Sequence, residues 1–176
     1  LPIYSTLAPH ILGTIRKINA EEYAELKDSG YSITDSIGES GIESAMESEL
    51  RGTPGELTIT IDADGNISEE VTKNPIQGNT IVLTIDKDLQ RLAQQKLEET
   101  CNEVSIRDSA GAVVVENVTN GEILAAATYP TYDLMDYYSD YSSLAKNSRR
   151  PLFNRFALGT YAPGSTFKPM MACAAL

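Results

Sequence analysis

The chain has 176 residues, and 41% of them are apolar, which is enough for a packed core in one domain or in two small ones. Its 25 acidic and 14 basic residues give a net charge of −11, so we expect it to repel nucleic acid and anionic membranes. The sequence holds no run of eighteen apolar residues and does not begin with a signal peptide, so we expect a soluble piece.

Two short helices are predicted in the first region, residues 1–74, over positions 19–28 and 40–52. Each begins with a polar residue followed three positions later by a glutamate, a pairing that caps the free N–H groups of a first turn. The pairs are Asn19 with Glu22 and Ser40 with Glu43. In the second helix Glu47 lies four residues before Arg51, so we expect their side chains to pair on the outer face.

A hairpin is predicted next, with strands over residues 57–61 and 67–71. Asp62-Ala63-Asp64-Gly65-Asn66 lies between them and contains the Asp-Gly pair that favours a tight turn. These five residues also hint at a calcium-binding loop, but Gly65 is the fourth residue rather than the sixth, where such a loop has its glycine. We therefore interpret the segment as a turn, and we expect no metal site in the chain.

The second region, residues 75–176, opens where Asn74-Pro75 interrupts the pattern. β-Branched residues predict a strand over 80–85. Asp86 and Asp88 then start a helix, where their charges favour the positive end of the helix dipole. The apolar face of this helix consists of Leu89, Leu92, Ala93, Leu97, Cys101 and Val104.

A second hairpin is predicted, with strands over 112–118 and 122–128 and a turn at Asn120-Gly121. The three consecutive valines from Val113 to Val115 predict a strand that is covered on both faces. Residues 129–150 then form a long connection.

Tyrosines and arginines gather in and around this connection. The tyrosines are Tyr129, Tyr132, Tyr137, Tyr138 and Tyr141. Their rings either stack on the sugars of a glycan or pack beneath a surface loop, and we favour packing. Arg149, Arg150 and Arg155 are either solvated charges or ion-pair partners of nearby acids that organise the approach to residues 162–169.

Cysteine and histidine are sparse. Cys101 and Cys173 have no paired spacing and lie on the apolar sides of predicted helices, so we expect buried free thiols rather than a disulfide. His10 is the only histidine, which excludes a Ser-His-Asp triad within the chain.

One segment does carry the residues of a nucleophilic site. Pro163-Gly164 breaks the chain, and the apolar run 170–176 predicts a helix, so Ser165 falls in its first turn. Lys168, three residues later, lies on the same helix face and is predicted to reach the Ser165 hydroxyl as its base. The helix N-terminus adds backbone N–H groups where an oxyanion would form.

The four-residue spacing by itself is weakly specific. Ser143-Leu144-Ala145-Lys146 matches it too, but has no Pro-Gly before it and no apolar helix after it, so we interpret this copy as a solvated loop or helix edge. The competing interpretation of Ser165 is an N-capping serine with an exposed lysine one turn later.

Longer stretches set the two copies apart. Around Ser165 the chain reads Asn154-Arg155-Phe156-Ala157-Leu158-Gly159-Thr160-Tyr161-Ala162-Pro163-Gly164-Ser165-Thr166-Phe167-Lys168-Pro169. Upstream are Gly111-Ala112-Val113-Val114-Val115-Glu116-Asn117, Asn120-Gly121-Glu122-Ile123-Leu124-Ala125 and Tyr129-Pro130-Thr131-Tyr132-Asp133. Further back are Gly41-Ile42-Glu43 and Leu50-Arg51-Gly52-Thr53-Pro54-Gly55. In this order, over nearly the whole chain, they resemble the class B, monofunctional penicillin-binding proteins.

The resemblance implies an α+β fold. Part of a pedestal (dimerisation-type) region, residues 1–74, would precede the N-terminal part of a serine β-lactamase-like transpeptidase domain, residues 75–176. It also implies D,D-transpeptidation of peptidoglycan stem peptides. Ser165 would be the nucleophile and give its backbone N–H to the oxyanion hole, Lys168 would be the general base, and β-lactams would acylate Ser165. No metal or cofactor is implied.

The chain departs from the family at one point. Penicillin-binding proteins complete the site with a Ser-x-Asn loop and a Lys-Thr-Gly or Lys-Ser-Gly strand, and neither pattern occurs in this sequence. We therefore expect a fragment that ends just after the Ser-x-x-Lys motif and is inactive alone. We also expect apolar surface on its valine-rich hairpin and, through that, self-association.

The family also implies a location and partners. The parent would lie at the extracytoplasmic face of the bacterial plasma membrane, anchored by an N-terminal transmembrane helix absent from this chain, and its pedestal would contact a membrane glycosyltransferase. Two alternatives are another Ser-x-x-Lys enzyme, such as a class D β-lactamase or a β-lactam sensor, and a non-catalytic interaction module for cell-wall synthesis partners.

Overall fold

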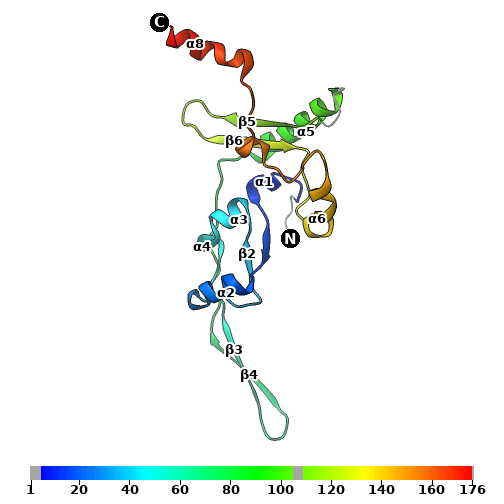
Figure 1. The fold of residues 1–176 in the computed structure, drawn as a ribbon. Coiled ribbons are helices and arrows are strands. Elements are labelled where there is room, and N and C mark those ends of the chain that lie inside the picture. The colour runs from blue at the N-terminus through cyan, green and yellow to red at the C-terminus, as the bar shows by residue number, and fades with distance from the viewer. Residues whose placement is uncertain (1–4, 105–108, 176) are drawn as a thin grey trace.

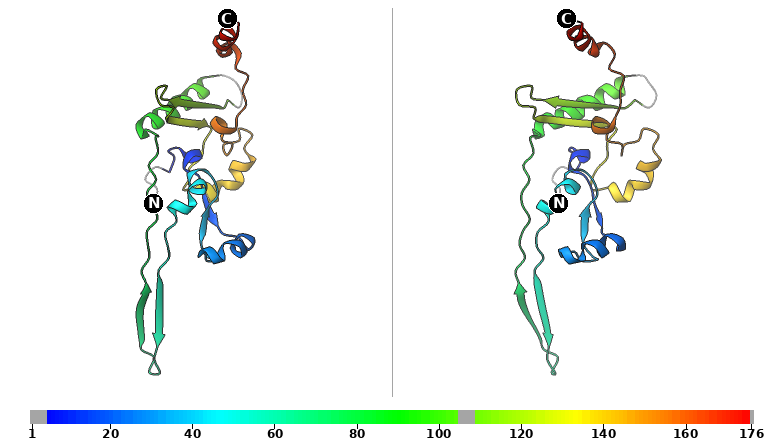
Figure 2. Two further views of the ribbon diagram at one scale, coloured as in Figure 1. Left: turned by 90° about the vertical axis from the view of Figure 1, so that its left-hand side faces the viewer. Right: turned by 60° about the vertical axis from the view of Figure 1, so that its left-hand side comes forward.

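The computed structural model describes residues 5–104 and 109–175, and it is elongated (Figure 1). A small unit of short helices and strands forms the middle of the molecule. A long helix packed on a hairpin lies at one end, and a second hairpin projects from the other. Two further views show that the projecting hairpin is joined to the rest by two extended segments running side by side (Figure 2).

The described residues form short elements, apart from one long helix. The helices are α1 (Pro9–Leu12), α2 (Ala20–Leu26), α3 (Gly41–Ala45), α4 (Glu47–Leu50), α5 (Lys87–Glu103), α6 (Tyr137–Lys146), α7 (Arg155–Leu158) and α8 (Lys168–Ala174), with 3-10 turns η1 (Lys27–Ser29) and η2 (Gly164–Phe167). The strands are β1 (Ile15–Lys17), β2 (Ser36–Gly38), β3 (Glu56–Ile61), β4 (Ile67–Lys73), β5 (Gly111–Glu116) and β6 (Ile123–Tyr129). They pair consecutively as antiparallel two-stranded sheets.

The first predicted helix is confirmed, with its cap. The Asn19 side chain accepts the Glu22 backbone N–H at 2.9 Å, and the Glu22 carboxylate accepts the Asn19 backbone N–H at 3.1 Å. The predicted helix is α2, which runs on into η1, and Gly30 follows η1 in the left-handed conformation. The local sequence was sufficient here because both capping partners lie within one turn.

The second predicted helix is wrong in detail, because the chain forms two short helices that meet at Met46. The Ser40 side chain does not cap α3. It accepts the Thr14 backbone N–H at 3.1 Å, so a contact distant in sequence replaces the local one.

The expected pair between Glu47 and Arg51 is also wrong. Glu47 accepts hydrogen bonds from the Tyr31 hydroxyl and the Gly38 backbone N–H, while Arg51 pairs with Asp35 at 2.7 Å. These tertiary partners occupy both side chains that could have paired along the helix.

The first hairpin is confirmed as β3–β4. Asp62 accepts the backbone N–H groups of Asp64 and Asn66, and Gly65 takes the left-handed φ of +84° that such a turn requires. Across residues 5–104 and 109–175, no group of three or more His, Cys, Asp or Glu side chains is placed to hold a metal ion.

The strand predicted over residues 80–85 is wrong. These residues are extended but make no strand ladder, and the Val82 side chain is 89% exposed. The end of the segment is hydrogen-bonded to β6. The Thr84 hydroxyl donates to the Ile123 carbonyl, and the backbone N–H of Asp86, just after the segment, donates to the Leu124 carbonyl. High β-propensity without a neighbouring strand does not form a sheet.

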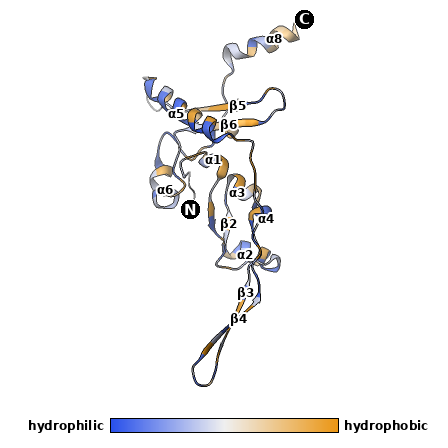
Figure 3. Cartoon of the chain, turned by 180° about the vertical axis from the view of Figure 1, so that it is seen from behind, coloured by the Kyte–Doolittle hydropathy of each residue, from blue (hydrophilic) through white to orange (hydrophobic). Residues whose placement is uncertain are grey.

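The long helix is confirmed as α5, which begins after Asp86, whose side chain accepts the N–H groups of Asp88 and Leu89. Its side chains cover β6, and Ala125 to Thr128 are almost fully buried. Val114 on β5 is 47% exposed, so the expectation that the valine run is covered on both faces is wrong. Apolar residues on this hairpin are visible from behind (Figure 3).

The connection over residues 129–150 is more ordered than predicted, because it contains helix α6. None of the helices formed by the described residues is long and apolar enough to cross a bilayer.

Candidate active-site segment

Ser165 lies in a 3-10 turn that runs directly into α8. Gly164 starts this turn with a φ of +54°, and the Lys168 backbone N–H donates to the Ser165 carbonyl. Pro169 is the second residue of α8, where its missing N–H breaks no helical bond. The predicted turn-to-helix transition is therefore present. Leu176, the last residue of the predicted helix, lies outside the described residues.

Both candidate catalytic side chains are exposed to solvent. Ser165 and Lys168 belong to a segment, residues 163–175, whose described side chains are all exposed. Within that described segment, no hydrogen bond joins the Ser165 hydroxyl to the Lys168 amine. The segment extends away from the rest of the molecule (Figure 1). The roles of the two residues stay predictions.

The segment before the nucleophile is held by Arg155. Its guanidinium donates to the carbonyls of Arg150 at 2.9 Å and Arg149, and its backbone N–H donates to the Thr128 hydroxyl at 3.2 Å. Arg155 is only 8% exposed, and burial lowers its pKa. The interpretation of Arg155 as a solvated charge is wrong, and its guanidinium donates to carbonyl groups rather than to acids.

Asn154 and Gly159, at the two ends of α7, shape the chain that leads to Ser165. Asn154 caps α7 by accepting the Ala157 N–H at 3.3 Å. At Gly159 a side-chain Cβ would lie 2.4 Å from the Arg155 carbonyl oxygen, so only glycine fits beside the end of α7. Residues 154–159 thus form a short capped helix, α7, and a glycine at its end that allows the close contact with the Arg155 carbonyl.

Sequence analysis did not identify the structural role of Gln90. It is fully buried on α5, where its side-chain amide donates to the Ala126 carbonyl at 2.8 Å and accepts the Ala126 N–H at 2.7 Å. A glutamine on a helix normally faces solvent, so only the contact with β6 reveals this role.

The tyrosine cluster is mainly a packing feature. Tyr132 is buried, and its ring lies edge-on to His10 at 4.9 Å and against Tyr137 at 5.4 Å between centroids. Tyr138 and Tyr141 are about half exposed, and both contact Tyr137 edge-on. The interpretation of the tyrosines as packing residues agrees with these contacts.

The two cysteines are free, as predicted, but differ in burial. Cys101 is half-buried beside the hairpin, and burial raises the pKa of its thiol. The expectation of burial is wrong for Cys173, which lies on α8, where all the described residues are exposed.

The second copy of the motif lies at the end of α6. The Ser143 hydroxyl donates to the Asp140 carbonyl at 3.0 Å, and Ser143 and Lys146 are both exposed. The interpretation as a solvated helix edge is confirmed.

Comparisons with known proteins cover nearly the whole chain. Residues 3–83 match the penicillin-binding protein dimerisation domain, and residues 111–176 match the penicillin-binding protein transpeptidase domain. The peptidoglycan D,D-transpeptidase MrdA of Acinetobacter baumannii is 35% identical over 179 residues, an alignment that covers 98% of this chain and 25% of that protein.

Solved structures agree with this result. Pseudomonas aeruginosa PBP2, in a complex with WCK 5153, is 34% identical with a TM-score of 0.70, over 95% of this chain and 32% of that one. A structure described as the coordination of polymerization and crosslinking by a peptidoglycan synthase complex is 28% identical with a TM-score of 0.72, over 85% of this chain and 28% of that one.

The chain thus spans about a quarter of the length of the curated relative. Both halves of the match fall in the expected order, with the pedestal region first. The chain belongs to the class B penicillin-binding proteins, with a region that matches their dimerisation domain followed by a region that matches their transpeptidase domain.

Proposed function

We propose that this chain supplies the nucleophile and its base to a peptidoglycan D,D-transpeptidase. The observation that carries the proposal is the position of Ser165 and Lys168. They lie at the 3-10 to α-helix transition, inside the region that matches the transpeptidase domain. Relatives named peptidoglycan D,D-transpeptidase align over 98% of the chain.

The reaction would pass through an acyl-enzyme. The Ser165 oxygen attacks the carbonyl carbon of the penultimate D-Ala of a stem peptide while Lys168 accepts the hydroxyl proton. The C–N bond to the terminal D-Ala then breaks, and that amine leaves with a proton. The amine of a neighbouring stem peptide attacks the ester and restores the Ser165 hydroxyl. A β-lactam would acylate the same oxygen.

The chain does not supply the whole site. The Ser165 backbone N–H is one oxyanion donor, and losing one of two such donors typically lowers the rate ~100- to 1000-fold. The Ser-x-Asn and Lys-Thr-Gly patterns do not occur among these 176 residues. We therefore propose that the chain alone is inactive and that activity requires the remaining elements of a transpeptidase domain.

Fluorescent penicillin tests the assignment, and the second motif copy provides matched controls. The probe is applied to the chain alone and to the chain continued by the elements that complete a transpeptidase domain. In the continued protein we expect Ser165→Ala and Lys168→Met to abolish labelling, whereas Ser143→Ala and Lys146→Met retain it. We expect no labelling of the chain alone. Labelling that survives Ser165→Ala would exclude Ser165 as the nucleophile.

We further propose the context in which the activity operates. The protein would lie at the extracytoplasmic face of the bacterial plasma membrane, anchored by an N-terminal helix, with residues 1–74 as a pedestal and 75–176 in the transpeptidase domain. The likeness to a peptidoglycan synthase complex supports a membrane glycosyltransferase as a partner of the pedestal.

A further inference from the structure

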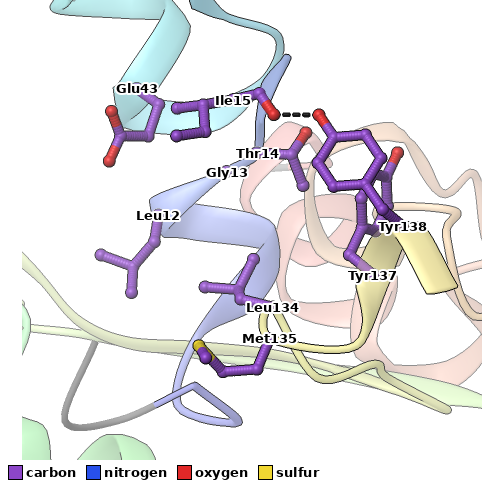
Figure 4. A pocket seen from close by; sticks show the side chains of 9 residues that line it. All are labelled: Leu12, Gly13, Thr14, Ile15, Glu43, Leu134, Met135, Tyr137 and Tyr138. Carbon is purple, nitrogen blue, oxygen red and sulfur yellow. Dashed lines mark hydrogen bonds between the residues drawn. The ribbon is translucent and has the colours of Figure 1, made fainter. Parts of the chain in front are cut away.

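A cavity of about 460 Å³ lies where the dimerisation region meets the transpeptidase region (Figure 4). Its walls are mainly apolar and include Leu12, Ile15, Leu134, Met135 and Tyr138, with Glu43 at one side. This volume is in the range of pockets that hold small organic molecules. None of these residues belongs to the segment that carries Ser165.

The cavity has walls from both regions of the chain, and direct bonds hold them together. Leu12, Ile15 and Glu43 come from α1, β1 and α3, whereas Leu134 and Tyr138 come from the connection and the start of α6. The Tyr138 hydroxyl donates to the Ile15 carbonyl, which Figure 4 marks with a dashed line. The Leu134 N–H donates to the Ser5 carbonyl at 3.0 Å. The space is therefore formed before any molecule enters it.

Glu43 gives the cavity its charge. Within residues 5–104 and 109–175, its carboxylate makes no hydrogen bond or ion pair, and no lysine, arginine or histidine lines the cavity. Burial raises the pKa of this carboxyl, and the nearby Glu47 raises it further. A carboxylate that is partly buried beside apolar groups is best satisfied by a cation that enters with an apolar body.

We propose that this junction cavity binds a small amphiphilic amine, with its ammonium group paired to Glu43 and its apolar body against Leu12, Leu134 and Met135. Such a molecule contacts both regions at once, so its binding stabilises their packing against each other. Charge complementarity selects this class, because the cavity offers one acid and no base.

The methionines provide the probe for the test. The whole chain is labelled with ¹³C at its methionine methyl groups and titrated with 4-phenylbutylamine and, separately, with 4-phenylbutan-1-ol. We expect the amine to shift the Met135 signal, while Met170 and Met171 on α8 stay unchanged. The alcohol has a similar shape and no charge, and we expect it to bind about tenfold more weakly, which corresponds to one charge-assisted hydrogen bond.

A matched pair of variants isolates the carboxylate. Glu43→Gln should lower the affinity for the amine about tenfold and leave the alcohol unchanged. The exposed Glu25, on α2, provides the control Glu25→Gln, which should bind the amine as the original chain does. The Glu43 carboxylate has no hydrogen-bond or ion-pair partner among the described residues, so its replacement should leave the spectrum of the free chain intact.

Three results would overturn the proposal. If neither compound shifts the Met135 signal at millimolar concentration, the cavity is not a ligand site. Equal binding of amine and alcohol, unaffected by Glu43→Gln, would rule out a role for the carboxylate. Equal shifts at Met135, Met170 and Met171 would show non-specific binding to exposed apolar side chains.

Discussion

The two hairpins β3–β4 and β5–β6 look alike in the sequence and differ in the structure. Each consists of a six-residue and a seven-residue strand, and each turns through a glycine with positive φ, +84° at Gly65 and +77° at Gly121. Every residue of β3 and β4 is exposed. In β6, by contrast, the side chains from Ala125 to Thr128 are at most 4% exposed.

Helix α5 accounts for this difference. It lies along β6, and Gln90 joins it to the Ala126 backbone by two hydrogen bonds. The first hairpin has no such partner in the part of the chain that the structure describes, and its strands lie apart from the rest of the molecule (Figure 2). The turn signal defines where a hairpin forms, while burial depends on what packs against it.

The first hairpin nevertheless has two distinct faces. Its register places Leu57 opposite Val71 and Ile61 opposite Ile67, so apolar side chains share one face. The other face carries Thr58 and Thr60 opposite Glu70 and Ser68. The alternating sequence thus specified which side is apolar, although those side chains are 52% to 65% exposed here.

Removing the two hydrogen bonds between Gln90 on α5 and Ala126 on β6 should have the largest effect on stability. Gln90→Leu leaves the N–H and the carbonyl of Ala126 buried without partners, so we expect a loss of about 2–5 kcal/mol in the free energy of unfolding. Urea unfolding monitored by circular dichroism measures this loss. The control is Gln95→Leu, on the exposed side of α5, which should change stability by less than about 0.5 kcal/mol.

The outcome bears directly on the comparison of the hairpins. If Gln90→Leu unfolds at the same urea concentration as the original chain, β6 is held by its apolar contacts alone. The two hairpins would then differ only in how much of their apolar surface is buried by other elements.

One substitution in each hairpin should give unequal changes in stability, smaller than the loss expected for Gln90→Leu. Ala126→Val adds volume at a site that is 4% exposed, so we expect it to cost about 1–3 kcal/mol in the free energy of unfolding. Ile59→Thr replaces a side chain that is 56% exposed by another β-branched one, and should change stability by less than about 0.5 kcal/mol. Equal losses in thermal or urea unfolding would show that β3–β4 packs against something in solution.

Lowering the pH should weaken the contacts of His10 with Pro151 and Tyr132, and we expect the smallest of the three changes in stability. His10 donates from Nε2 to the Pro151 carbonyl at 2.8 Å and contacts the Tyr132 ring. Burial lowers its pKa from the usual 6.5, and the nearby Arg155 lowers it further, whereas the hydrogen bond to Pro151 opposes the shift. The unfolded chain therefore takes up the proton first as the pH falls.

This sign defines the expected pH dependence. The contribution of His10 is complete above about pH 6.5 and is lost as the pH falls through the lower, folded pKa. Urea midpoints compared at pH 7.5 and 5.5 should fall more for the original chain than for His10→Gln, which keeps a donor and does not titrate. Hydrogen exchange in β3–β4, corrected for intrinsic rates, should show no His10-dependent change, and an equal response in both hairpins would contradict the comparison.

Some features of the candidate site depend on residues that are close in the sequence, and others depend on contacts made only in the folded chain. The Pro163-Gly164 break, the turn at Ser165 and the helix after it follow from neighbouring residues, and the sequence predicted them. Arg155 carries no comparable signal, because its carbonyl partners and the Thr128 hydroxyl come together only when the loop folds onto β6. The pairing of Ser165 with Lys168 stays a prediction.

By itself the sequence determined the features whose partners lie within a few residues: the capping box of α2, the cap of α5, both glycine turns and the Ser165–Lys168 spacing. Only the tertiary structure decided that residues 80–85 form no strand, that Met46 interrupts a helix, and that Gln90 and Arg155 are buried. The physical reason is that backbone caps and turns are satisfied locally. The burial of a polar side chain depends on which distant carbonyl and N–H groups the fold brings beside it.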